Sequence, residues 1–400
     1  MTRAILTLNS GSSSLKFALF PVDSTTTVPD LSGRIEGIGR APTFYARDGA
    51  GTLLDPGPLA RLHPATPHDA LIARLLPWLD QWLGAGDLVA VGHRVVHGGA
   101  GFSAPVRLND TIMAQLDALT PLAPLHQPHN LAAIRAVAAW RANIAQIACF
   151  DTGFHAGMDR LNTLFALPRA ISDSGVRRYG FHGLSYRHIA NILPDHLGAQ
   201  ANGRVIVAHL GNGASLCAMQ NRRSVATTMG FTALDGLMMG RRCGALDPGV
   251  VLHLMQSMGM DAAAIERLLY HESGLLGVSG ISNNMQVLLN TDHPDAREAV
   301  ELYCHKAAGV LAGLLPAIGG LDALVFTAGI GENAGPVRQG ICDRLAWLGV
   351  TLDPQANARN ATRISPEGAP ITVLVLPTNE EAVVADACRA QIVKDHAATV

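Results

Sequence analysis

Short apolar runs rich in Val and Ile alternate with longer segments of helical periodicity along the chain. This alternation is typical of an α/β fold, in which helices cover a sheet. Predicted strands are residues 4–8, 15–20, 88–91, 144–150, 205–210, 215–219, 323–326 and 371–376. Predicted helices are residues 68–83, 130–140, 261–269, 296–315 and 380–394, the last with Thr378 and Asn379 as capping residues.

Three glycine-rich turns follow predicted strands: SGSSSL at 10–15, GNGASL at 211–216 and TAGIGENA at 327–334. One such turn alone is more often a structural hairpin than a phosphate site. The first is not a P-loop, because Lys16 leads into a strand rather than a helix. Small residues do let backbone N–H groups approach an anion. Three turns together favour two similar domains with phosphate or nucleotide between them.

Composition narrows the class of partner. Of 400 residues, 48% are hydrophobic and 16% are charged, which suits a globular chain with one large core or two domains. A net charge of −2 provides no basic field for nucleic acid or an anionic membrane, so a small-molecule partner is expected. The six cysteines are scattered and are expected to be reduced.

The chain shows no targeting or membrane-spanning pattern. The most apolar run, residues 307–320, is too short for a membrane span and contains Pro316. The N-terminal segment lacks the features of a signal peptide, so a cytoplasmic location is expected.

Two acidic residues stand where hard cations bind. Asp151 follows the strand 144–150 directly, and strand ends of this kind point side chains toward an active site. Glu380 begins the last predicted helix. Together they suit Mg²⁺, which takes one or two carboxylates plus water and phosphate. The alternative for Asp151 is a turn cap, and for Lys16 an edge-strand lysine.

Ten motifs in one order resemble the acetate kinase family, within the superfamily of acetate and sugar kinases, heat-shock chaperones and actin. They are LNSGSSSLKFAL, GHRVVHGG, PLHQPHN, FDTGFH, RRYGFHG, HLGNGAS, MGFTALDGLMMGRRCG, SGLLGVSG, FTAGIGENA and LPTNEE. The resemblance implies two similar domains of the actin-like, ribonuclease H-like type with an active-site cleft between them. Residues 1–150, joined by helix 380–400, would bind acyl substrate and phosphate, and residues 151–379 would bind nucleotide.

The resemblance also implies an activity. It is reversible transfer of the γ-phosphoryl group of ATP to acetate, giving acetyl phosphate and ADP, with Mg²⁺ (or Mn²⁺) as cofactor and a homodimer as the assembly. Propionate or butyrate as acceptor and pyrophosphate as donor are alternatives. A nucleotide-binding clamp without turnover is a further one, and it is disfavoured because Arg94, Asp151, His182 and Arg242 are all retained.

Each site residue is assigned through this resemblance. The metal would lie at Asn9 and Glu380, and the catalytic group would be Asp151, His182, Arg242 and His126. Acetate would contact Arg94, Val96, Leu125, Phe181 and Ala233. The phosphates would contact Ser12, Ser14, Lys16, His209, Leu210, Gly211, Asn212 and Gly213, and the adenosine would contact Asn284, Met285, Gln286, Gly329, Ile330, Gly331, Glu332 and Asn333. A carboxylate acceptor is already ionised, so Asp151 is expected to position metal rather than accept a proton.

Several positions depart from the family pattern, yet the charged residues at the phosphoryl site are kept. Asn284, Met285 and Gln286 replace an Asp-x-Arg element, which predicts weaker nucleotide binding and competition from pyrophosphate. Ala233 replaces a proline, which predicts a larger acyl pocket and use of propionate. Further departures are Gln127, Leu184, Tyr186, Ala226 and Ala245.

Overall fold

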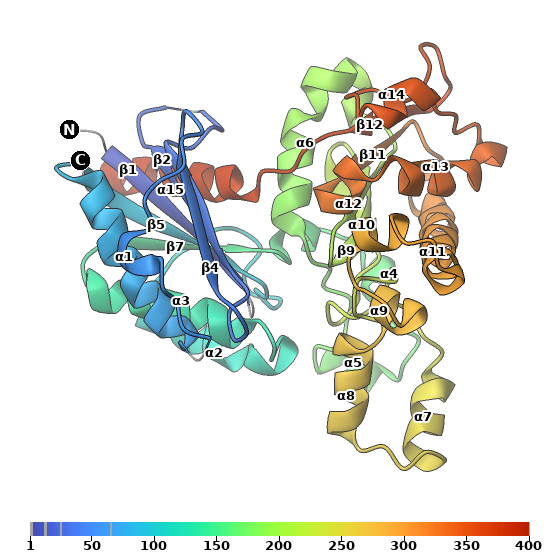
Figure 1. The fold of residues 1–400 in the computed structure, drawn as a ribbon, viewed down its shortest axis with the longest axis horizontal. Coiled ribbons are helices and arrows are strands. Elements are labelled where there is room, and N and C mark those ends of the chain that lie inside the picture. Colours follow the sequence, from blue (N-terminus) through green and yellow to red (C-terminus); the bar gives the residue numbers. More distant parts are fainter. Residues whose placement is uncertain (1–2, 12–13, 25, 65, 400) are drawn as a thin grey trace. The chain divides into compact units, whose positions relative to one another are not determined.

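The structure is a computed structural model that describes residues 3–11, 14–24, 26–64 and 66–399. It divides into two compact units (Figure 1). The first unit comprises Met1–Gly153 with Asn379–Val400, and the second comprises Phe154–Thr378. The chain therefore leaves the first unit once and returns to it for the last helix.

The first unit is built on a seven-stranded sheet in the order β4-β3-β2-β1-β5-β7-β6. β1 runs antiparallel to β2 and parallel to β5, which is parallel to β7. The strands are β1 (Arg3–Ser10), β2 (Ser14–Pro21), β3 (Leu31–Glu36), β4 (Thr43–Asp48), β5 (Asp87–Val95), β6 (Val106–Arg107) and β7 (Ala145–Phe150). The helices are α1 (His68–Leu83), α2 (Asp110–Ala118), α3 (Gln127–Trp140) and α15 (Glu380–Thr399).

Helices cover both faces of the central strands, which explains why β1 and β5 are apolar on both sides. Leu6 and Leu8 of β1 join a buried cluster with Leu71 and Leu75 of α1. Successive residues of a strand face opposite sides of the sheet, so Thr7, between Leu6 and Leu8, faces away from α1. Thr7 pairs with Gly92 of β5, which therefore lies on that opposite face, against α15. A Cβ on Gly92 would lie 2.4 Å from Val384 Cγ1, so α15 packs closely because this residue has no side chain.

The second unit is built on a five-stranded sheet in the order β10-β9-β8-β11-β12. Its strands are β8 (Val205–Leu210), β9 (Ala214–Gln220), β10 (Arg223–Thr227), β11 (Ala323–Thr327) and β12 (Thr372–Val375). Its helices are α4 (Arg160–Thr163), α5 (Arg169–Asp173), α6 (Gly183–Leu197), α7 (Pro248–Gln256), α8 (Ala262–His271), α9 (Gly274–Ser279), α10 (Met285–Leu289), α11 (Pro294–Ile318), α12 (Ala328–Asn333), α13 (Gly335–Asp343) and α14 (Pro354–Ala358). Ile189 and Leu193 of α6 pack on Val205 and Val207 of β8.

The two sheets repeat one topology. In each, an antiparallel hairpin adjoins two parallel strands: β2-β1-β5-β7 in the first unit and β9-β8-β11-β12 in the second. The echoing turns at 10–15 and 211–216 join the matching hairpin strands, β1 to β2 and β8 to β9. The predicted α/β fold with two similar domains of actin-like type is thereby confirmed.

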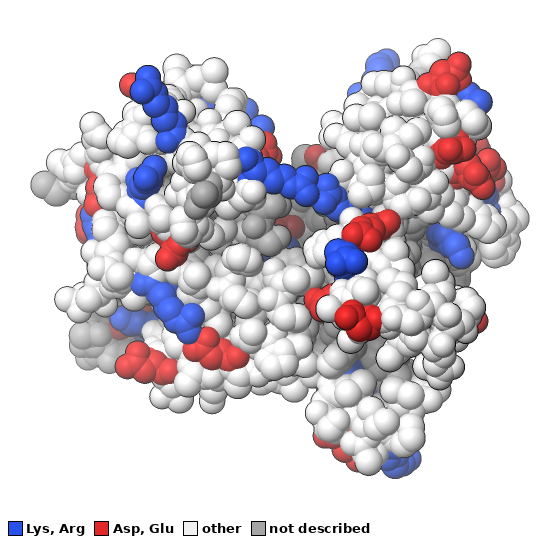
Figure 2. Space-filling model, turned by 60° about the horizontal axis from the view of Figure 1, so that its bottom comes forward, with Lys and Arg blue, Asp and Glu red and all other residues white. Residues whose placement is uncertain are grey.

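The surface charge and the state of the cysteines agree with what the composition predicts. On the face in Figure 2, acidic and basic side chains are interspersed and most of the surface carries neither. The six cysteines are free thiols, of which only Cys243 is partly exposed. Within the part of the chain that the structure describes, no helix has the length and apolar character needed to cross a membrane.

Candidate active site

In the first unit, the predicted site residues gather around the guanidinium of Arg94, near the end of β5. Asp151 follows β7 directly, and the parallel strands bring both side chains to one edge of the sheet. Arg94 Nη2 donates to Asp151 Oδ2 at 2.6 Å, and Arg94 Nε donates to Asp151 Oδ1 at 3.0 Å. Asp151 is buried, and this two-point ion pair compensates its charge.

Two further oxygens approach the same guanidinium. Arg94 Nη1 donates to Asn9 Oδ1 at 3.2 Å and lies 3.5 Å from Glu380 Oε2. Burial by itself lowers the pKa of Arg94, but Asp151 and then Glu380 outweigh it and raise that pKa above its ordinary value. Burial, and then Glu380, raise the pKa of the neighbouring Glu381. The cluster thus combines one fixed cation with an excess of carboxylate.

The side-chain oxygens around Arg94 are of the kind that bind a divalent cation. Asn9, Asp151 and Glu380 bring hard oxygen ligands from β1, the end of β7 and the start of α15, and hard oxygens are what Mg²⁺ and Mn²⁺ bind. Among the described residues, no three His, Cys, Asp or Glu side chains form a metal site by themselves. The arrangement therefore suits an open site that leaves positions for water and phosphate.

The first glycine-rich turn is hydrogen-bonded to the start of α1. A hydrogen bond of 2.8 Å from Gly11 N to Ser14 O closes the turn, and His68 Nε2 lies 2.9 Å from Gly11 O. Because a carbonyl only accepts, Nε2 carries the hydrogen. Ser14 is half-buried and Lys16 is exposed on β2. Ser12 lies outside the described residues.

The first turn of α3 supports the strand ends. Asn130 Oδ1 accepts from Val96 N at 2.9 Å, and Asn130 Nδ2 donates to Ser10 O at 2.6 Å, so it joins the exits of β5 and β1. Gln127 is fully buried and bonds the backbone of His97 with both ends of its amide. Sequence reasoning missed both supports, although they stand inside PLHQPHN. Leu125 and His126, just before α3, are half-buried. Val96, directly after β5, is buried.

In the second unit, two histidines stack beside the turn between β8 and β9. The rings of His182 and His209 are 4.2 Å apart and nearly parallel. His182 precedes α6 with a left-handed backbone (φ 59°), which is costly for a residue with a side chain and is often found at functional sites. Its Nδ1 lies 2.8 Å from Ser215 Oγ, and His209 Nδ1 lies 2.8 Å from Ser185 Oγ.

Arg242 completes this cluster. A Cβ added to Gly213 would lie 3.3 Å from both Arg242 Nη2 and His182 Nε2, so the guanidinium and the imidazole both border the space over this glycine. Arg242 Nη1 donates to Ala233 O at 2.7 Å, which holds the guanidinium in place. Phe181 is buried, and its carbonyl lies 2.9 Å from His155 Nε2.

A pocket of about 280 Å³ lies next to the same turn. Its lining residues are Gly211, Asn212, Asn283, Asn284, Met285, Gln286, Gly329, Ile330, Asn333 and Ala334. None of them is charged, and five are carboxamides. The structure thus brings together six of the eight residues predicted to contact adenosine, with Gly211 and Asn212 from the predicted phosphate turn. It adds Asn283, which sequence reasoning missed and which donates to Asn212 Oδ1 at 3.1 Å.

Three of the residues predicted to bind nucleotide, Glu332, Leu210 and Gly331, do not line this pocket. Glu332 does not line the pocket, since its Oε1 accepts from Ala328 N at 2.8 Å and from Thr378 N at 3.2 Å. It therefore braces the third glycine-rich turn. Leu210 and Gly331 are buried beneath the turns.

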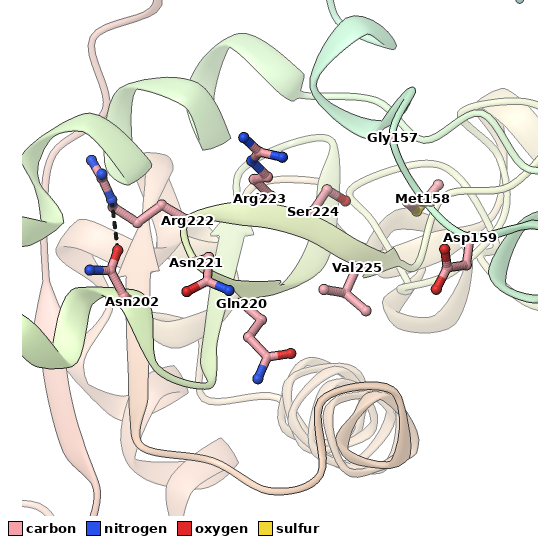
Figure 3. Close-up of a pocket in the computed structure, with 10 residues that line it drawn as sticks. All are labelled: Gly157, Met158, Asp159, Asn202, Gln220, Asn221, Arg222, Arg223, Ser224 and Val225. Atoms are coloured by element: carbon pink, nitrogen blue, oxygen red, sulfur yellow. Dashed lines mark hydrogen bonds between the residues drawn. The ribbon is translucent and has the colours of Figure 1, made fainter.

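A larger hollow, of about 620 Å³, lies at the β9–β10 hairpin (Figure 3). Arg222 and Arg223 extend to one side of the hairpin, whereas Gln220 extends to the other. Arg222 donates to Asn202 Oδ1 at 3.1 Å. The polar side chains that line the hollow do not converge on one point. We therefore do not assign the reaction site to this hollow, although it is the larger of the two.

The repeated sheets, the glycine-rich turns and the two clusters define the chain as a phosphotransferase of the two-domain, actin-like class. The model of the acetokinase family matches residues 4–386. The chain belongs to the acetokinase family.

Named relatives and solved structures agree with this membership. The acetate kinase of Rhodopseudomonas palustris (strain TIE-1) is 53% identical over 391 residues, covering 96% of this chain and 97% of the relative. A crystal structure of a propionate kinase from Francisella tularensis has a TM-score of 0.89 at 34% identity, covering 97% of this chain and 99% of its own. The crystal structure of Porphyromonas gingivalis acetate kinase has a TM-score of 0.84 at 33% identity, covering 98% and 100%.

Proposed function

We propose that this chain is a Mg²⁺-dependent acetate kinase. An acetate oxygen would attack the γ-phosphorus of ATP, the bond from that phosphorus to the β,γ-bridging oxygen would break, and acetyl phosphate and ADP would form. The single observation that carries the proposal is that Arg242 Nη2 and His182 Nε2 both border the space over Gly213, beside an uncharged pocket lined by predicted nucleotide residues. Relatives named acetate kinase favour acetate over propionate.

The second unit would hold ATP and stabilise the transferred group. Nucleoside contacts would come from the carboxamides of the 280 Å³ pocket, and phosphate contacts from the turn at Gly211–Gly213. A phosphoryl group in transfer spreads negative charge over three oxygens, so fixed donors matter most. Arg242 and His182 would supply them.

The first unit would hold acetate and the cation. Arg94 would bind the acetate carboxylate in exchange for part of its contact with Asp151, and Val96 and Leu125 would contact the methyl group. Asn9, Asp151 and Glu380 would hold Mg²⁺, which when bound neutralises phosphate charge. A carboxylate acceptor has no proton to lose, so no residue needs to act as a base.

Family membership also supports a homodimer in the cytoplasm. Gel filtration with light scattering on the purified chain tests the dimer, for which about 84 kDa, twice the 42.0 kDa of one chain, is expected. A mass near that of one chain would contradict it.

The activity is tested by trapping acyl phosphate with hydroxylamine. Acetate or propionate would be paired with Mg-ATP or pyrophosphate, with EDTA as the control. Acetate with Mg-ATP is expected to give the highest kcat/KM. Faster turnover with pyrophosphate would overturn the donor, and faster turnover with propionate would overturn the acceptor. No product from any pair would overturn the proposal itself.

A further inference from the structure

The hydrogen bonds behind His182 determine which of its ring nitrogens carries a hydrogen. Tyr186, on the first turn of α6, is fully buried, and its hydroxyl lies 2.5 Å from Ser215 Oγ on β9. Ser215 Oγ in turn lies 2.8 Å from His182 Nδ1. Among the described residues, the side chain of Ser215 has no other hydrogen-bond partner, and the Tyr186 hydroxyl has only Ser215.

Only one assignment of hydrogens satisfies all three groups. The Tyr186 hydrogen has a single acceptor, Ser215 Oγ, and burial raises the pKa of Tyr186 well above its usual value, so the phenol keeps that hydrogen. Ser215 accepts from Tyr186 and must then donate its own hydrogen to His182 Nδ1. Reversing the direction would leave a buried phenol hydrogen without an acceptor, which is unfavourable.

We propose that Tyr186 is a positioning residue that acts through Ser215 to hold His182 neutral, with its hydrogen on Nε2. A neutral imidazole that accepts at Nδ1 carries its hydrogen on Nε2. Nε2 is the atom that lies with Arg242 Nη2 over Gly213. His182 therefore presents an N–H donor to the transferred phosphoryl oxygens. The opposite tautomer would present a lone pair to the same negative oxygens.

The guanidinium of Arg242 also favours an uncharged His182 ring. Arg242 Nη2 and His182 Nε2 both lie over Gly213, so a positive charge on His182 would be repelled by the Arg242 guanidinium. Tyr186 is a departure from the family pattern. The function that its hydroxyl serves here follows from its contacts in this chain.

Long-range ¹H–¹⁵N spectra of ¹⁵N-histidine-labelled protein test the tautomer directly, with His182→Gln assigning the signals. The wild-type chain is expected to show His182 protonated at Nε2. Tyr186→Phe and Ser215→Ala are each expected to add the Nδ1–H form. A wild-type ring protonated at Nδ1, or variants that leave the tautomer unchanged, would overturn the proposal. This measurement needs no turnover, so it also decides the inference if the proposed function fails.

The kinetic test rests on the proposed function. Tyr186→Phe and Ser215→Ala should each lower kcat about 10- to 100-fold, as loss of a partner that orients a functional imidazole typically does. KM values should stay within about threefold, because ground-state binding is kept. The double variant should lose no more than the worse single variant, since both substitutions break one chain of bonds.

Tyr303→Phe is the matched control. Tyr303 is also buried, but its hydroxyl has no hydrogen-bond partner among the described residues, so its loss should leave kcat unchanged. Equal kcat in Tyr186→Phe and Tyr303→Phe would contradict the proposal. If Tyr186→Phe loses its thermal transition, Ser215→Ala and the wild-type spectrum decide.

Discussion

Arg94 has a partner in the structure that its sequence motif does not indicate. Its motif suggests a side chain for the substrate carboxylate, whereas the structure pairs it with a carboxylate of the protein, Asp151, at 2.6 Å. A guanidinium binds either carboxylate with the same geometry. If Arg94 binds the substrate carboxylate as proposed, Asp151 would have to release part of this contact, and Asp151→Asn would then change the affinity for acetate.

The first prediction concerns Arg242. Arg242→Ala should lower kcat about 100-fold or more, because it removes one fixed donor to the transition state, while the Kd for nucleotide changes little. Kinetics and calorimetric titration with ADP measure the two quantities. Arg241→Ala is the adjacent control and should retain turnover. Wild-type kcat in Arg242→Ala would remove this residue from the mechanism.

The second prediction concerns the uncharged pocket. Gln286→Arg should lower the KM for ATP, since a guanidinium adds ionic and stacking contacts that an amide lacks. Asn284 Oδ1 accepts from Gln286 N at 2.9 Å and so caps α10, which the substitution leaves in place. The ratio of ATP to pyrophosphate turnover should rise. An unchanged ratio would show that residue 286 does not contact nucleotide.

Within the helices of the second unit, two glycines should respond to an added methyl group in opposite ways. Gly309 lies exposed inside α11, and a Cβ there would meet nothing within 4 Å. Gly309→Ala should raise the free energy of unfolding by about 0.5–1 kcal/mol, because a helical glycine loses more backbone entropy. Gly340→Ala in α13 is the contrast, since its Cβ would lie 3.0 Å from Cys304 Sγ and should destabilise the unit. Urea unfolding compares them, and equal shifts would refute the distinction.

Elements were predictable where the pattern was long and apolar. The strands within β1, β2, β5, β7, β8, β9, β11 and β12 and the helices within α1, α3, α8, α11 and α15 were all predicted. The capping residue Asn379 is confirmed by its 3.0 Å bond with Ala382 N. The half-exposed strands β3 and β4 were not predicted, because few of their residues are apolar. The helix α10 was not predicted because its five residues are too few to show a helical period.

Side-chain partners were the least predictable part of the site. The carboxamide contact of Asn283 with Asn212 joins residues 71 positions apart, and no local spacing indicates it. The same holds for Tyr186 and Ser215, which meet because α6 packs on the sheet of the second unit. Motifs predict which residues lie at the site, while tertiary packing decides their hydrogen bonds.

At the scale of the whole molecule, buried neutral histidines predict a dependence of stability on pH. Burial lowers the pKa of His93 in β5 to about 4 and that of His155 to about 4, against 6.5 as the ordinary value. Between these limits the unfolded chain binds more protons than the folded chain. Stability should therefore be complete above about pH 6.5 and fall as the pH decreases toward 4.

Urea unfolding at pH 7.5 and pH 5 measures this effect. Each histidine should cost about 2 kcal/mol over that interval. His93→Gln should remove its share of the pH dependence, while replacement of the exposed His253 by Asn should leave it unchanged. An identical pH dependence in wild type and His93→Gln would contradict this account.

The return of the chain to its first unit has a consequence for biosynthesis. Residues 3–153 leave the ribosome well before α15, whose Val384 and Cys388 cover the bare surface at Gly92. Until some 225 intervening residues have been translated, this face of the nascent sheet stays uncovered. The amino-terminal unit, although synthesised first, would thus be the last to complete its core.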